Sequence, residues 1–204
     1  YISSAKVNVD FTKKIEIINE HSNYKSRSFY ANHKLDTEQI ILRYLKNSKI
    51  NSYIFRLPLV IGPNAKGNLL RLYQYIKTNL PIPVINTNNK RSFISTNNLN
   101  LLIHKVLTSN IIFKPGTFLI CNDEKLSTLE LIKYIKKSLR KKSFLILINP
   151  KFARIFLLKF KFINFFYNQN IDNSKAKINF NWQPDNDVKN SLNIMLQSYK
   201  KKYE

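Results

Sequence analysis

Apolar positions divide the 204-residue chain into short continuous runs and longer stretches in which they recur every three or four residues. The clearest run is 52–61 (SYIFRLPLVI), which is typical of a parallel strand covered on both faces and which Gly62-Pro63 ends. A strand that leads into a loop is predicted over 1–9, further strands over 117–121 and 144–148, and a short extended piece within the connection 81–95.

Helical patterns fill the segments between these runs. Over 28–46, Ser28 can cap the helix and apolar residues repeat four positions apart. Ser127 and Glu130 have the spacing of a capping box, which opens a further helix. Other helices are predicted over 68–78, 97–109, 172–179 and 187–200. Strands that alternate with helices predict an α/β fold with a parallel sheet.

The apolar and basic segment 152–166 (FARIFLLKFKFINFF) has two interpretations. It is either an amphipathic helix that lies on a membrane surface or a helix of a small subdomain with its lysines reaching outward. We favour the subdomain helix because Lys159 and Lys161 would interrupt a membrane span. Stable membrane insertion is therefore not expected.

Charge and composition narrow the classes of function. The net charge of +22 would suggest a nucleic acid, but the basic residues are mostly scattered lysines without an arginine-rich stripe, so we expect no nucleic-acid partner. The single cysteine, Cys121, rules out a disulfide framework and predicts a cytoplasmic location. His21 and His104 lack partners at metal-ligand spacing, so no metal site is predicted.

The segment Tyr30-Ala-Asn-His-Lys34 carries the most informative chemistry. Residues four apart share one side of a helix, so the phenol and the ammonium can point into the same cleft. A free tyrosine has a pKa of about 10, and a neighbouring cation favours its phenolate, which gives an acid/base usable at neutral pH. Chance matches to Tyr-x-x-x-Lys are common in a chain so rich in both residues, so the surrounding motifs decide the interpretation.

Three other features accompany this pair. Ser3-Ser4 stands at a strand end, where a serine hydroxyl could hold the substrate oxygen whose proton Tyr30 exchanges. Gly67-Asn68 opens a helix, and the free amides at a helix start can bind an anion. Lys90-Arg91 follows a proline-rich segment and could clamp a diphosphate.

The order of these motifs resembles the extended short-chain dehydrogenases/reductases, namely the NAD-dependent epimerase/dehydratase family and within it the UDP-glucose 4-epimerase-like enzymes of surface-polysaccharide pathways. The resemblance runs from Ser3 to about Lys200. It implies a partial Rossmann-type parallel sheet with helices on both faces, plus a small mixed C-terminal subdomain that binds the substrate. Residues 1–62 would be the remainder of the NAD(P)-binding domain and 63–204 mainly the substrate subdomain, with 97–121 returning to the sheet.

The resemblance also implies roles for individual residues. Ser4, Tyr30 and Lys34 resemble the catalytic serine, the acid/base and the lysine that tunes it and holds the nicotinamide ribose. The cofactor would also contact Ser3 and the backbone at Pro58 and Leu59. The UDP-sugar would be held by Ser4, together with the diphosphate-binding side chains Asn68 and Arg91.

Departures from the family pattern leave several alternatives open. Leu59 stands where many 4-epimerases have an asparagine, so a UDP-4-keto-hexose reductase (quinovosamine-type) is the alternative to a UDP-hexose 4-epimerase. The dinucleotide fingerprint G-x-G-x-x-G is absent from the sequence, which suggests an N-terminally truncated chain and leaves a catalytically inactive fragment open. The cofactor implied is NAD, with NADP not excluded, and the family often forms homodimers.

Overall fold

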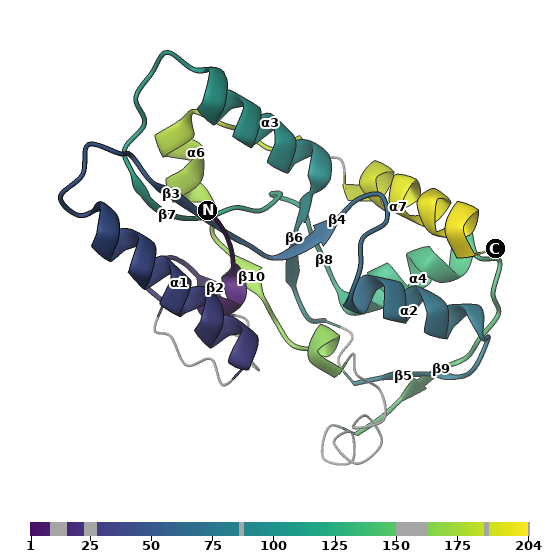
Figure 1. Ribbon diagram of the computed structural model, residues 1–204. Helices are drawn as coiled ribbons and strands as arrows, with labels where there is room; N and C mark the ends of the chain where they lie inside the picture. The colour runs from purple at the N-terminus through teal and green to yellow at the C-terminus, as the bar shows by residue number, and fades with distance from the viewer. Residues whose placement is uncertain (9–15, 23–27, 86–87, 150–162, 186–187, 204) are drawn as a thin grey trace.

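The computed structural model describes residues 1–8, 16–22, 28–85, 88–149, 163–185 and 188–203, and these form a mixed α/β fold (Figure 1). Its helices are α1 (Phe29–Leu45), α2 (Asn68–Lys77), α3 (Thr96–Thr108), α4 (Thr128–Ser138), α6 (Ser174–Phe180) and α7 (Val188–Tyr203). Two short 3-10 helices, η1 (Ala5–Val7) and η2 (Ile163–Phe166), complete the set of helical elements among these residues. The predicted α/β class with a parallel sheet is confirmed.

One sheet contains three parallel strands in the order β1 (Ile2–Ser4), β3 (Tyr53–Leu57) and β7 (Gly116–Leu119). Helix α1 lies on one side of this sheet, whereas α3 and α6 lie on the other (Figure 1). Successive side chains of a strand point to opposite faces, so Phe55 and Leu57 face the core beside α3 and α6, while Arg56 points toward α1.

A second sheet has the order β4 (Leu59–Ile61), β6 (Arg91–Ser95) and β8 (Lys125–Leu126), with β4 and β6 parallel and β8 antiparallel to β6. The prediction of one strand over 52–61 was therefore wrong. Pro58 separates β3 from β4, because its ring fixes φ and it has no N–H to donate to a sheet. The chain changes its pairing partners at this proline, from β1 and β7 to β6.

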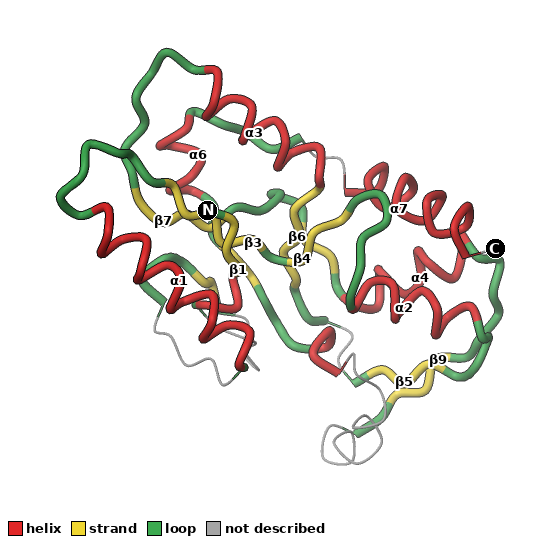
Figure 2. Tube along the Cα trace, in the orientation of Figure 1, coloured by secondary structure: helices red, strands yellow, loops and turns green. Residues whose placement is uncertain are grey.

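Two further pairs of parallel strands are short: β5 (Ile82–Val84) with β9 (Leu145–Leu147), and β2 (Ile17–Ile18) with β10 (Asn170–Ile171). Figure 2 shows β5 and β9 together, apart from the other strands. The connection 81–95 thus holds two strands, β5 and β6, where one extended piece was predicted. Most of the helix predicted over 152–166 lies outside the described residues, and its last four residues form η2.

Two main apolar cores hold these elements together. The larger one joins α2, α4 and α7 to the second sheet through fully buried side chains such as Leu72, Ile132 and Phe93. The other lies between the first sheet and α3 and α6, where the rings of Phe180 and Phe118 meet edge to face with centroids 4.7 Å apart. The cores share no member, although β6 contributes to both, with Phe93 in the larger core and Ile94 in the other.

Candidate active site

A cavity of about 260 Å³ lies where the two sheets meet. Its walls come from the end of β1, the start of α1, the β3–β4 junction, the start of α2, β6 and the segment around η2 and β10. The lining residues are Ser4, Lys6, Tyr30, Leu57, Pro58, Leu59, Val60, Asn68, Arg91, Phe165 and Gln169. The cavity thus contains six of the eight residues that the sequence predicted for the site, and leaves out Ser3 and Lys34.

The first wall is the turn that follows β1. Ser4 ends the strand in register with Leu57 of β3, and its side chain caps η1 by accepting a hydrogen bond from the Lys6 backbone N–H at 3.3 Å. The sheet therefore holds the Ser4 backbone, and the cap holds its side chain. Ser4 also belongs to the lining of the cavity.

Helix α1 supplies Tyr30 in its first turn. Ser28 caps the helix as predicted, because its hydroxyl accepts a hydrogen bond from the Ala31 N–H at 3.2 Å. Tyr30 is 53% exposed and lines the cavity, with the Lys6 Nζ 6.0 Å from the centroid of its ring. The phenol is thus accessible to a ligand and lies beside a cation other than the predicted lysine.

Lys34 makes a different contact. Its Nζ donates a hydrogen bond of 3.0 Å to the Ile2 carbonyl oxygen and lies 4.9 Å from the centroid of the Tyr1 ring. The lysine therefore ties α1 to the backbone of β1 and lies outside the cavity lining. Its predicted role toward the ribose of a cofactor stays a prediction.

Asn68 and Arg91 form the opposite part of the lining. Gly67 caps α2 with φ 74°, a left-handed conformation that favours glycine, and Asn68 is the first residue of the helix. Arg91 belongs to β6 and is 5% exposed. Its Nη1 donates to the Tyr167 carbonyl oxygen at 3.3 Å, and its Cζ lies 5.2 Å from the centroid of the Phe165 ring. Burial lowers the pKa of Arg91 to about 10, which leaves the guanidinium charged at neutral pH.

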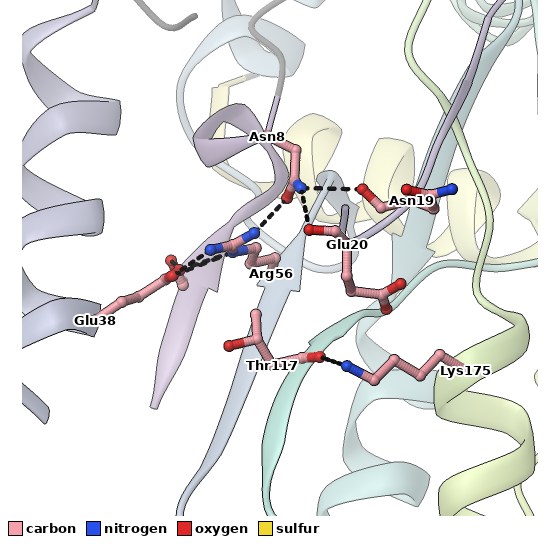
Figure 3. Close-up of polar contacts among 8 residues, drawn as sticks. Asn8, Asn19, Glu20, Glu38, Arg56, Thr117 and Lys175 are labelled. Carbon is pink, nitrogen blue, oxygen red and sulfur yellow. Dashed lines mark hydrogen bonds and ion pairs between the residues drawn. The ribbon is translucent and has the colours of Figure 1, made fainter. Parts of the chain in front are cut away.

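A buried polar network holds α1 against the first sheet (Figure 3). Glu38 of α1 receives hydrogen bonds from the Arg56 guanidinium, with Nη2 at 2.6 Å and Nε at 3.0 Å, and a short one from the Ser3 hydroxyl. Arg56 Nη1 also donates to the Asn8 Oδ1 at 2.8 Å, and Asn8 Nδ2 donates to the Asn19 carbonyl oxygen at 3.0 Å. Ser3 is thus placed in this network, while its neighbour Ser4 faces the cavity.

The network is linked to the cavity because Glu38 lies on the same side of α1 as Tyr30. Tyr30, Lys34 and Glu38 are four residues apart and therefore share one side of α1. An ion pair at Glu38 fixes the rotation of the helix about its axis, and with it the direction of Tyr30. Neither Glu38 nor Lys6 was predicted for the site, although the continuation of the four-residue spacing from Tyr30 to Glu38 is a signal that could have found the former.

The first 121 residues match the model of the NAD dependent epimerase/dehydratase family. The chain belongs to this family. A curated UDP-glucose 4-epimerase from Vibrio cholerae is 29% identical over 147 residues, which is 69% of this chain and 43% of that protein. The chain is thus similar to less than half of this relative's length.

Solved structures support the same fold. The chain superposes in full on 61% of a UDP-glucuronic acid 4-epimerase from Bacillus cereus solved with NAD, with a TM-score of 0.77 and 21% identity. It also superposes in full on 63% of a UDP-glucose 4-epimerase from Thermotoga maritima solved with UDP-glucose, with a TM-score of 0.71 and 13% identity. At these identities the likeness shows the fold alone. In the part of the chain that the structure describes, the helices are too short or too polar to cross a bilayer.

Proposed function

We propose that this chain forms the substrate side of an NAD-dependent UDP-hexose 4-epimerase. The observation that carries the proposal is that one cavity gathers Ser4, Tyr30, Pro58, Leu59, Asn68 and Arg91 from five separate segments. Curated and solved relatives named as UDP-sugar 4-epimerases support the substrate class. The single buried cysteine, Cys121, fits the cytoplasm, and synthesis of surface polysaccharide is the pathway we expect.

One end of the cavity would bind the diphosphate, and the other would carry out the proton transfer. Arg91 and the Asn68 amide would bind the diphosphate of the UDP-sugar, because a guanidinium and an amide are donors that match phosphate oxygens. The hexose would then reach Ser4 and Tyr30. Tyr30 would take the proton of the C4 hydroxyl while the Ser4 hydroxyl holds the same oxygen, and it would return the proton after the sugar has turned.

The wall formed by Ser4, Tyr30, Pro58 and Leu59 fits the nicotinamide end of NAD, because it combines an accessible phenol with apolar side chains against which a flat ring can pack. NAD, when bound, accepts and returns the hydride of the sugar C4. The same wall would serve a one-way 4-keto reductase, for which NAD(P)H would supply the hydride. Leu59 favours this second candidate, since it lines the cavity with an alkyl group where many 4-epimerases have an asparagine.

The test is turnover of UDP-glucose by the full-length protein with Tyr30→Phe, followed by chromatography of the products. We expect kcat to fall at least about a hundredfold while the affinity for UDP-glucose is kept, because only the proton transfer is lost. Tyr44→Phe is the matched control, since Tyr44 lies on the same helix and is 82% exposed. Undiminished turnover in Tyr30→Phe would remove this residue from the mechanism. Reduction of a UDP-4-keto-sugar by NADPH without the reverse reaction would favour the reductase.

A further inference from the structure

Strand β9 carries apolar side chains that the protein leaves exposed. All three of its residues are exposed, whereas the three residues of its partner strand β5 are buried. Phe144, which precedes β9, is 79% exposed, and Leu147 at its end is 73% exposed. In the described part of the chain, β9 pairs with β5 alone, so its outer edge is open. A continuous exposed apolar surface of this kind is typical of an interaction site.

Basic residues are concentrated in the chain just before β9. Lysine and arginine make up most of the segment 133–142, which forms the second half of α4 and the connection to β9. The sequence contains no aspartate or glutamate from position 131 to position 171. The apolar strand therefore follows a strongly positive segment that holds no acid of its own.

Helix α7 brings further lysines to the same end of the molecule. The Lys200 Nζ donates a hydrogen bond of 2.7 Å to the Ser138 carbonyl oxygen at the end of α4, and Lys201 and Lys202 follow in the last turn of α7. Figure 1 shows the last turns of α4 and α7 side by side, with the chain running from α4 to β9. Glu204, which comes after α7, lies outside the described residues.

Helix ends account for only some of these charges. A lysine near the C-terminus of a helix can bind the free carbonyl groups there, and Lys136 does so at the Ser143 carbonyl oxygen. Lys137, Arg140 and Lys142 are exposed instead, and their side chains form no ion pair within the described ranges. We call these three residues, together with Lys201, the basic patch. Its charges are available to an anionic partner.

We propose that the basic patch and β9 bind the surface of a lipid bilayer that contains anionic lipids. The negative potential of such a surface attracts lysine and arginine, and exposed apolar side chains can enter the boundary between headgroups and acyl chains. A nucleic acid would match the charge, but it offers no apolar phase to the aliphatic side chains of β9. The binding is a reversible adsorption, and it does not depend on the sugar-nucleotide site.

Co-sedimentation of the chain with lipid vesicles tests this proposal. One set of vesicles consists of phosphatidylcholine, and the other contains about one third phosphatidylserine. We expect the chain to bind the phosphatidylserine vesicles at least about tenfold more tightly at low salt. The difference should shrink as salt is added, because added ions screen the attraction between the surface and the basic patch.

A charge variant makes the test specific to the basic patch. The triple change Lys137→Gln, Arg140→Gln and Lys142→Gln should weaken binding to the phosphatidylserine vesicles about a hundredfold, the effect of three charges near the surface.

Its matched control removes one arginine and two lysines from exposed positions at the end of α1 and just after it, through Arg43→Gln, Lys46→Gln and Lys49→Gln. The overall charge changes equally in the two variants, so the control should keep most of the wild-type affinity. Circular dichroism and thermal melting establish that both variants fold as the wild type does.

A second pair of variants tests the apolar strand. Leu147→Ser removes an exposed apolar side chain from β9 and should weaken binding about tenfold, because that side chain no longer enters the bilayer boundary. Leu107→Ser makes the same change at the end of α3, where Leu107 is 77% exposed, and should leave binding unchanged.

Three results would overturn the proposal. The first is equal binding to the two kinds of vesicle, and the second is an equal loss of binding in the two charge variants. The third is binding of a single-stranded DNA oligonucleotide, lost in the charge variant of the basic patch, by a chain that does not bind the phosphatidylserine vesicles; it would assign the patch to nucleic acid. Equal affinity of Leu147→Ser and Leu107→Ser would remove β9 from the binding surface.

Discussion

Helices α1 and α2 each supply a residue to the cavity, Tyr30 and Asn68, but they are attached to the molecule in different ways. Helix α2 has 10 residues, four of which are buried and apolar. Helix α1 has 17 residues and buries only Ala31 and Glu38, one of which is an acid. The longer helix therefore has much the smaller apolar contact with the protein.

The difference indicates what fixes each helix. Helix α2 is held by its apolar contacts in the larger core. The hydrophobic effect that stabilises such contacts does not depend on their direction. Helix α1 is held by the ion pair of Glu38 with Arg56 and by the bond of Lys34 to β1, which both depend on direction. We infer that directional contacts suit α1 because Tyr30 must point accurately into the cavity.

The largest effect is expected from breaking the polar attachment of α1. Glu38→Ala leaves the Arg56 guanidinium without its carboxylate in a largely buried place, so the free energy of unfolding should fall by about 4 kcal/mol. Urea denaturation followed by circular dichroism measures this loss. The control is Asp36→Ala, which removes an exposed acid from the same helix. Equal losses in the two variants would mean that the network does not hold α1.

The next effect comes from the apolar attachment of α2. Leu72→Ala removes a fully buried side chain from the larger core and should lower the free energy of unfolding by about 3 kcal/mol. Leu42→Ala makes the same change on α1, where Leu42 is 45% exposed, and should cost less than about 1 kcal/mol. Thermal melting of both variants sharpens the comparison, and a cost for Leu42→Ala as large as that for Leu72→Ala would contradict it.

The smallest effect concerns α4, which packs against α2 and begins at a capping box. The Ser127 backbone N–H and the Ser127 hydroxyl lower the pKa of Glu130 below its ordinary value of 4.5. A lowered carboxyl pKa stabilises the fold above the unfolded pKa, and this contribution is lost as pH falls through the folded pKa.

Glu130→Gln should therefore destabilise the chain by less than about 1 kcal/mol at pH 7. The gap between wild type and variant should narrow as pH falls below about 4.5, where the carboxyl of the unfolded chain becomes protonated. Urea denaturation at pH 7 and at pH 3.5 measures both values. A gap that stays constant between these two pH values would contradict the charge-dependent part of the cap.

Local contacts were the part of this structure that the sequence predicted best. Ser28 and Ser127 each bond to a backbone N–H three residues away, so the residues that make these caps are visible in a short stretch of sequence. The six predicted residues that line the cavity were identified from the resemblance to a family, whose fold brings distant segments together. Periodicity or spacing alone would not have placed Arg91 beside Tyr30 in one cavity.

What the sequence did not predict depends on distant partners. Glu38 meets Arg56 18 residues later, and nothing in either neighbourhood indicates that both are buried. The run 52–61 looked like one strand because its apolar character continues across Pro58, whereas the change of sheet depends on where β6 and β7 lie. Lys6 lies in the short helix η1, where the sequence shows no periodicity, so only the structure shows that it lies beside Tyr30.

The most direct measurement is a crystal structure of this chain grown with UDP-glucose. It should show the diphosphate bonded to the Arg91 guanidinium and the Asn68 amide, with the C4 hydroxyl of the sugar against Ser4 and Tyr30. A nucleotide bound outside the cavity, or one that places its uracil beside Tyr30 and its sugar beside Arg91, would contradict the assignment of the site.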